Sequence, residues 1–170
     1  RLVECAFMVI SLFAHKWASS ATSLKTQYLG LALYVLAEAI IFLPLMYMAM
    51  YFVGPDVVAK AGIVTGFVFA GLTLTVFVTR KDFSFMRGAL SVAGFGAIGI
   101  IVASVLFGFS LGSWFSGAMV ILAGGYVVYE TSNVLHHYRP GQHVAASLAL
   151  FASVGLMFWY ILQLFMSSRD

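Results

Sequence analysis

Long apolar segments are the feature that most constrains this chain. Five of them, at 28–53, 57–79, 87–109, 112–135 and 143–166, have at least the roughly 20 residues that a membrane-spanning helix needs. Hydrophobic residues make up 62% of the 170 residues and charged residues 9%, whereas soluble domains carry about 25% charged residues. We therefore predict an all-α integral membrane protein that folds as a polytopic helix bundle.

A sixth apolar segment, 2–14, is shorter and starts almost at Arg1, with no initiator methionine. The simplest interpretation is that the chain lacks its natural N-terminus, including part of this helix and any helix before it. A signal peptide is the alternative, but Glu4 lies inside the apolar part and no small-residue cleavage pattern follows. All connections are short, so we expect one helix-bundle domain over residues 1–170, with about six segments.

The basic residues are distributed unevenly between the two ends of the predicted bundle. The loops after the first, third and fifth segments hold Lys16, Lys25, Arg80, Lys81, Arg87 and Arg139, and the opposite side holds Arg1, Lys60 and Arg169. The positive-inside rule then places the loop between 79 and 87 in the cytoplasm and the C-terminus outside. The net charge of +3 is small, so we expect contact with a lipid bilayer and none with nucleic acid.

Small residues at helical spacing predict where helices meet, because helices in lipid associate through close backbone approach. The predicted contact faces are Gly62, Gly66, Ala70 and Thr73 in one segment and Gly96, Gly99 and Ala103 in the next. Pro44 removes one backbone hydrogen bond and predicts a kink in the segment 28–53.

Two acids, Glu38 and Glu130, lie within apolar runs. Insertion of a central acid costs roughly 2.5 to 3.5 kcal/mol, so such residues usually face the bundle or water and often mark an ion path. One interpretation makes Glu38 a protonated tie between helices, with Tyr34 one turn before it. The other makes it a polar point on a path through the bundle.

Glu130 also has two interpretations. It lies near the predicted cytoplasmic end, where a carboxylate can simply reach water. However, Tyr126, Glu130, Asn133 and His137 follow one another at spacings of four, three and four, which predicts one polar stripe lining a cavity or gate.

Other chemistry finds little support in the sequence. His136, His137 and His143 flank a polar turn, but no recognised spacing supplies a further ligand, so we expect no metal site. As neighbours of Glu130, these histidines could change charge between about pH 5 and 8. Cys5 is the only cysteine, and neither an HExxH motif nor a phosphate-binding loop is present, so we do not expect an enzyme.

Four stretches carry a family resemblance: GLTLTVFVTRKDFSFM (71–86), YETSNVLH (129–136), ASLALF (146–151) and the terminal SSRD. They resemble the Bax inhibitor-1 family, also called the transmembrane Bax inhibitor motif family, and within it the bacterial YccA-like branch. That branch is known for modulators of the membrane protease FtsH. The resemblance implies a seven-helix fold in the bacterial inner membrane.

The family also includes a pH-sensitive calcium leak, in which an acid of the penultimate helix pairs with an acid of the last helix. The resemblance places Glu130 at the first position, but Ser153 stands where the second acid is expected. Two close carboxylates sense pH through like-charge repulsion, and this chain lacks that pair. Glu4 and His15, eleven residues apart, match an early-helix acid and the basic latch of the pore.

Two functions therefore remain open. The first is a leak for calcium ions or protons with Glu130 as the gating acid, Glu38 as a second polar point and Ca²⁺ as a transient ligand rather than a cofactor. The second is a non-conducting interaction protein that modulates FtsH.

Overall fold

The computed structural model describes residues 23–168 and confirms an all-α membrane protein. Its helices are α2 (Leu24–Met48), a π-helical turn η1 (Ala49–Val53), α3 (Asp56–Thr79), α4 (Met86–Phe107), α5 (Ser113–His136) and α6 (His143–Ser167). The described residues contain five spans long and apolar enough to cross a membrane, with α2 and η1 forming one of them. The five long segments are thus confirmed, and the predicted segment 2–14 lies outside the described residues.

Local chemistry sets the ends of these helices. The Ser23 hydroxyl accepts a hydrogen bond from the Thr26 amide at 3.2 Å and caps the start of α2. Gly54 has φ +126°, a backbone conformation that residues other than glycine rarely adopt. Together with Pro55 it makes the turn between η1 and α3. These connections are short, so consecutive helices run in opposite directions.

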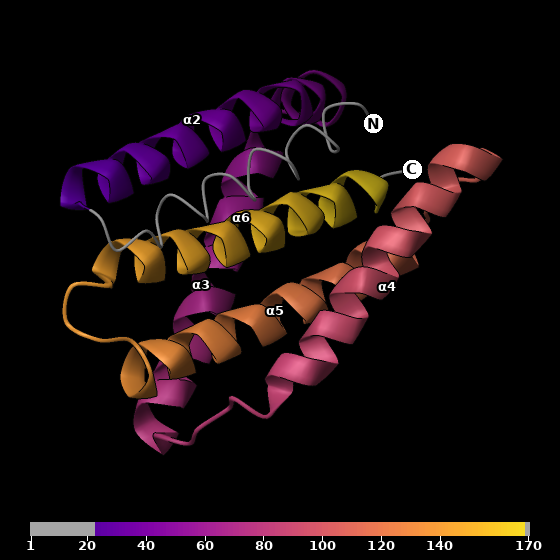
Figure 1. Cartoon of the computed structure of the whole chain (residues 1–170). Coiled ribbons are helices and arrows are strands. Elements are labelled where there is room, and N and C mark those ends of the chain that lie inside the picture. The colour runs from indigo at the N-terminus through magenta and orange to yellow at the C-terminus, as the bar shows by residue number, and fades with distance from the viewer. Residues whose placement is uncertain (1–22, 169–170) are drawn as a thin grey trace.

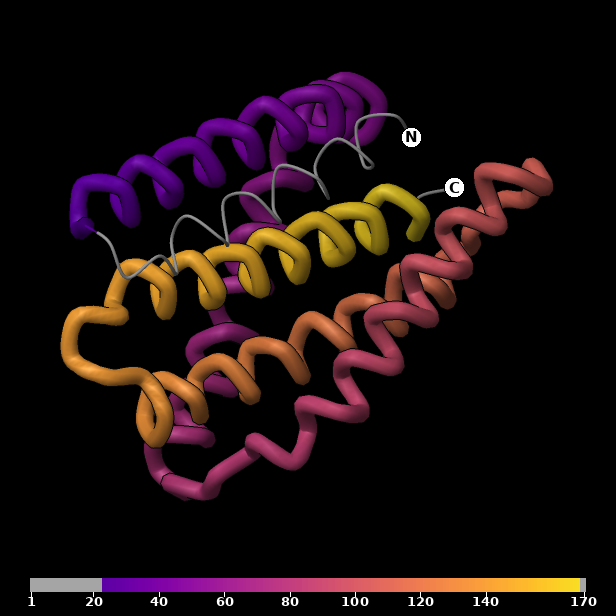
Figure 2. Tube along the Cα trace, viewed as in Figure 1, coloured from indigo at the N-terminus to yellow at the C-terminus, as the bar shows by residue number. Residues whose placement is uncertain are grey.

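Helix α6 occupies the centre of the bundle and packs against α5, α3 and α2 (Figure 1). Helix α4 lies along one side, where α5 is its main neighbour, as the tube also shows (Figure 2). Leu148, Met157 and Leu162 of α6 are fully buried. Large apolar side chains such as Phe67 and Phe95 point outward, as expected for a surface that faces lipid.

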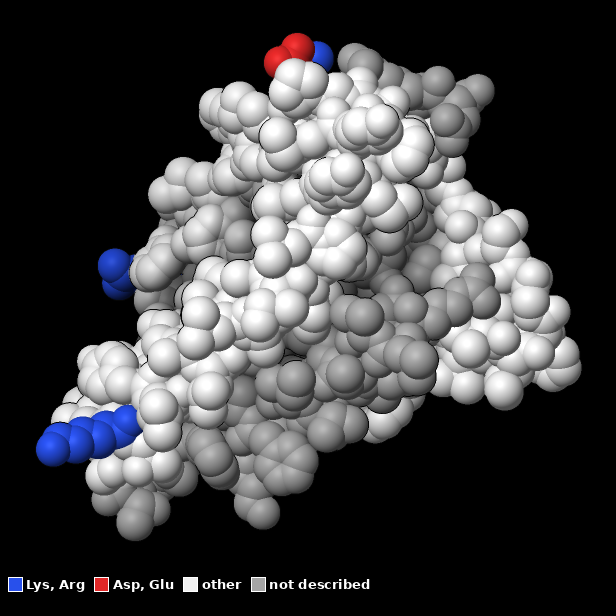
Figure 3. Space-filling model, turned by 90° about the horizontal axis from the view of Figure 1, so that it is seen from above, with Lys and Arg blue, Asp and Glu red and all other residues white. Residues whose placement is uncertain are grey.

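The outer surface is almost free of charge along the spans. Seen from above, the molecule shows charged side chains only at its margins (Figure 3). The start of α2 lies at the same end as the α5–α6 connection, because the Tyr28 hydroxyl and His143 Nε2 are 3.0 Å apart. The α3–α4 loop also lies at this end, where Asp82 contacts His137.

The predicted small-residue contact faces are wrong. Gly62, Gly66, Gly96 and Gly99 are exposed, and nothing lies within 4 Å of where their Cβ atoms would be. Helix α3 instead buries Val57, Ala61, Thr65 and Val76. Small residues occur all round these helices, and an evenly apolar helix offers no sequence signal for which side meets a neighbour.

The true close approaches use other glycines. A Cβ on Gly94 of α4 would lie 2.7 Å from the Tyr126 hydroxyl oxygen, and one on Gly125 of α5 would lie 2.9 Å from Leu90 Cδ2. These positions let α4 lie against α5. Near Pro44, α2 continues to Met48 and then widens into the π turn; the kink itself stays a prediction.

Candidate functional site

Glu130 lies on α5 and lines a cavity of about 220 Å³ between α5 and α6. The cavity is lined by Tyr126, Glu130, Ala149, Ala152, Ser153 and Leu156. The structure therefore brings together Glu130 and Ser153, which the sequence had linked only through a family resemblance. The Ser153 hydroxyl donates to the Ala149 carbonyl at 3.0 Å, within its own helix.

The carboxylate of Glu130 has partners from its own end of α5. Asn133 Nδ2 donates to Glu130 Oε2 at 3.5 Å, and the Tyr138 hydroxyl donates a second hydrogen bond. Burial raises the pKa of Tyr138 to about 12, and the negative charge of Glu130 adds to this effect. Tyr138 therefore stays protonated and remains a donor to Glu130. The sequence analysis did not single out Tyr138, because it lies beyond the end of the helix.

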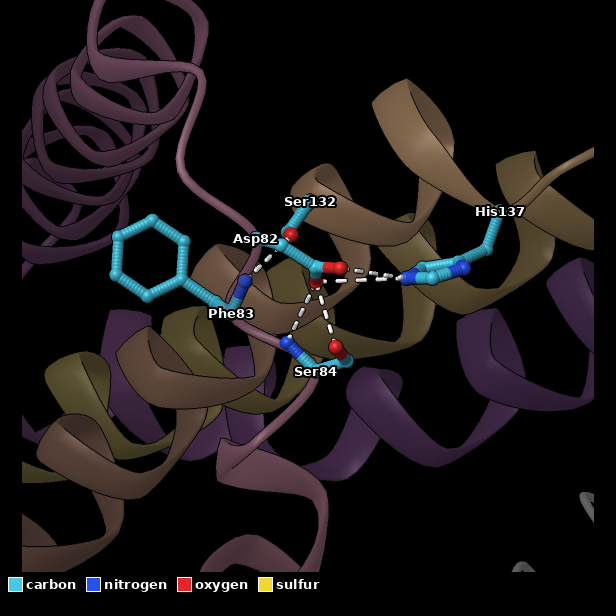
Figure 4. A network of polar contacts seen from close by, with 5 residues as sticks. All are labelled: Asp82, Phe83, Ser84, Ser132 and His137. Carbon is cyan, nitrogen blue, oxygen red and sulfur yellow. Dashed lines mark hydrogen bonds and ion pairs between the residues drawn. The ribbon is translucent and has the colours of Figure 1, made fainter.

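His137 contacts the α3–α4 loop. Its Nε2 lies 3.2 Å from Asp82 Oδ2 and 3.4 Å from Oδ1, an ion pair when the imidazole is protonated (Figure 4). Both side chains are about half exposed, at 49% and 47%. Helix α5 ends at His136, so His137 lies just past its end and Asp82 is its observed partner; its predicted role beside Glu130 stays a prediction.

Asp82 is the centre of this loop contact. It accepts hydrogen bonds from the Ser84 hydroxyl at 2.6 Å and the Ser84 amide at 2.9 Å. These bonds, followed by the contact with His137, lower the pKa of Asp82 to about 2. In the same network the Phe83 amide donates to the buried hydroxyl of Ser132 at 2.9 Å (Figure 4). The loop is thus fastened to the C-terminal turns of α5, beside Glu130 and Asn133.

The remaining member of the predicted stripe, Tyr126, serves packing. Its hydroxyl donates to the Leu90 carbonyl of α4 at 3.0 Å. The stripe expected from sequence therefore divides: Tyr126 meets α4, Glu130 and Asn133 bind each other, and His137 meets the loop. Tyr126 and Glu130 still share the cavity wall.

A second polar point lies toward the opposite end of the same two helices. The Ser116 hydroxyl of α5 donates to Gln163 Oε1 of α6 at 3.2 Å. Both residues line an open cavity of about 580 Å³. The sequence analysis missed both, although a glutamine near the end of an apolar run is a readable signal for a polar contact between helices.

Glu38 lies on α2, is only 4% exposed, and faces α6 at Gly155. It lines a separate cleft, although Ala152 and Leu156 contribute to both this cleft and the Glu130 cavity. Glu4 and His15 lie outside the described residues. Within residues 23–168 no group of three or more histidine, cysteine or acidic side chains could hold a metal ion.

The chain matches the Bax1-I family model, described as inhibitor of apoptosis-promoting Bax1, over residues 2–170. An uncharacterized protein of Pseudomonas aeruginosa is 28% identical over 160 residues, which cover 94% of this chain and 68% of that protein. The Escherichia coli K12 protein YccA, named modulator of FtsH protease, is 31% identical over 118 residues, covering 68% of this chain and 53% of YccA. In a second Escherichia coli strain the similar protein is named inner membrane protein YccA.

Bax inhibitor 1 of Schizosaccharomyces pombe is 29% identical over 121 residues, covering 68% of this chain and 44% of that protein. The chain thus spans about half the length of YccA and of the yeast relative.

Proposed function

The chain belongs to the Bax inhibitor-1 family, and from this premise we propose that it is a leak for calcium ions or protons in the bacterial inner membrane. Glu130 would be the ion-facing acid. The observation that carries the proposal is the cavity between α5 and α6, which Glu130 of α5 and Ser153 of α6 both line. An acid at membrane depth that faces such a space is typical of an ion or proton path.

The cavities suggest the course of the path. The Glu130 cavity lies between α5 and α6, and the Ser116–Gln163 cavity lies at the other end of these two helices, where α2 and η1 also line it. Between them Ala123, Val127 and Met157 are fully buried, so apolar side chains close the path in this conformation. Conduction would require α5 and α6 to separate at these residues.

The contacts of Glu130 suggest how opening could depend on pH. Asn133 and Tyr138 donate to its carboxylate and hold it against the end of α5. Protonation of Glu130 would weaken both contacts, because a protonated carboxyl group is a poorer acceptor. We therefore expect acid to favour opening.

The basic residues support an orientation for this path. Of the six described lysines and arginines, Lys25, Arg80, Lys81, Arg87 and Arg139 lie at the end that carries the α3–α4 loop, and only Lys60 lies at the other. The positive-inside rule then makes the Glu130 end cytoplasmic.

The test is ion flux through the purified full chain in liposomes, measured with calcium-sensitive and pH-sensitive dyes from acidic to alkaline pH. Ser153→Asp restores a like-charge pair with Glu130 and should move the opening transition to higher pH. Ser147→Asp makes the same charge change at an exposed position of α6 that lines neither cavity, and is the matched control. Liposomes that stay as tight as empty ones at every pH would contradict the leak.

A second candidate function is modulation of an FtsH-type membrane protease, favoured by the 31% identity to YccA. It needs no conducted ion. Protease and protein reconstituted together should then degrade a membrane substrate at a changed rate, while flux stays at the level of empty liposomes. That combination would replace the leak with the interaction function.

A further inference from the structure

The contact between α2 and α6 is built around the side chain of Glu38. A Cβ added at Gly155 of α6 would lie 2.9 Å from the carboxyl carbon of Glu38, and closer still to its Oε1. Atoms do not approach so closely, so only glycine fits opposite Glu38. With 4% of its surface exposed, the side chain is held inside the protein.

The carboxyl group is not fully hydrogen-bonded there. Oε2 is buried, and no hydrogen bond joins it to any residue of the described range 23–168. The cleft of about 90 Å³ that Glu38 lines is otherwise formed by Ile41, Phe42, Ala152, Gly155, Leu156, Trp159 and Tyr160. None of these lining residues is basic.

The titratable groups near Glu38 in the described helices are few. Tyr34 lies one turn before it on α2, and Tyr160 of α6 lines the same cleft. Glu130 of α5 lies in the neighbouring cavity that shares Ala152 and Leu156. None of these groups brings a positive charge to Glu38.

An ionised carboxylate without a cation or hydrogen-bond donor is very costly in an apolar setting, whereas a neutral carboxyl group costs far less. We infer that Glu38 is a proton-binding site at membrane depth, occupied at neutral pH and distinct from the Glu130 site. The proton is the ligand, and the neutral acid is what allows α2 to lie against Gly155. This inference does not depend on whether the protein conducts ions.

A protonated carboxyl group in an apolar cleft is a target for a hydrophobic carbodiimide. The Glu38 O–H adds across one C=N bond: the oxygen bonds to the central carbon, the proton moves to the nitrogen, and nothing leaves. Transfer of the acyl group from oxygen to nitrogen then gives a stable N-acylurea. An ionised carboxylate lacks the proton that this addition requires.

The experiment treats the full chain in liposomes with dicyclohexylcarbodiimide and locates the adduct by peptide mass spectrometry. We expect the adduct on Glu38 at acidic and neutral pH, its decline at alkaline pH, and its persistence in the Glu130→Gln control. A water-soluble carbodiimide should leave Glu38 unmodified. Failure to modify Glu38 at any pH, while other carboxyl groups react, would count against the site.

Infrared spectroscopy gives a second measurement that does not depend on access of a reagent. At neutral pH the parent protein should show the C=O band of a protonated carboxyl group, and Glu38→Gln should lose it. Glu130→Gln should retain it. If the parent shows no such band at neutral pH, Glu38 is ionised and the inference is wrong.

Discussion

The two acids inside the apolar helices occupy opposite chemical settings. Glu130 is partly buried, faces a cavity, and accepts hydrogen bonds from Asn133 and Tyr138. Glu38 is almost fully buried, packs against Gly155, and has no hydrogen-bond partner for Oε2 within residues 23–168. Depth in a membrane span therefore does not define the role of an acid. The hydrogen-bond donors around an acid define its role, because they determine which charge state the acid can hold.

The largest expected effect tests the Glu38 side of this comparison. Gly155→Leu places a side chain where Glu38 already lies, and overpacking of this kind typically costs about 1–3 kcal/mol or more. We expect the variant to lose monodispersity and heat stability in detergent. The double variant Gly155→Leu with Glu38→Ala should recover part of the loss, because it removes the carboxyl group from the contact.

Gly62→Leu is the matched control, since nothing lies within 4 Å of a Cβ at that position. It should melt like the parent. Equal damage from both substitutions would show that the α2–α6 contact is not specially tight.

The next effect concerns the α3–α4 loop, which is hydrogen-bonded to α5 near Glu130. Ser132→Ala removes the buried acceptor of the Phe83 amide, and loss of such a hydrogen bond typically costs about 1 kcal/mol. We expect faster hydrogen exchange at 80–85 and a slightly lower melting temperature. Unchanged exchange in this loop would mean that Ser132 does not hold it.

Asp82 adds a pH dependence to the same loop. The pKa of Asp82 falls from 3.8 to about 2 in the folded protein, so its contribution is present above pH 3.8 and is lost as pH falls toward 2. Loop exchange should therefore rise in this acidic range in the parent. Asp82→Asn should show fast exchange at every pH.

The smallest effect is spectroscopic and sharpens the Glu130 side. Tyr138 has a pKa of about 12, with burial as the main cause and Glu130 as the next. Glu130→Gln should lower that pKa only in part, because burial remains. An alkaline absorbance titration, with Tyr138→Phe to assign the signal, measures the change. If the pKa of Tyr138 is the same in Glu130→Gln as in the parent, the two side chains do not interact.

The sequence predicted the spans well, because span length and low charge follow directly from the thickness of the bilayer. It did not predict which side of each helix is buried. Gly62 and Gly66 looked like a contact face, yet the contacts form at Gly94, Gly125 and Gly155. Lipid is as apolar as the protein interior, so a helix in it carries little pattern that fixes its rotation.

Only part of the Glu130 site could be predicted from the sequence. Helical spacing placed Asn133 beside Glu130 correctly, because both lie within α5. It did not predict the partner of His137, which lies just past the helix end and meets Asp82, a residue 55 positions away. No spacing rule reaches across that distance, so contacts from loops had to come from the structure.

The most direct test of the account compares two carboxyl-to-amide substitutions in one flux assay. Glu130→Gln and Glu38→Gln each keep the size of the side chain and remove its ability to ionise. We predict that Glu130→Gln loses most of the pH dependence of flux, because it removes the acid that faces the cavity, whereas Glu38→Gln keeps the dependence of the parent. The reverse result, with Glu38→Gln insensitive to pH and Glu130→Gln unchanged, would contradict the assignment of the ion-facing acid to Glu130.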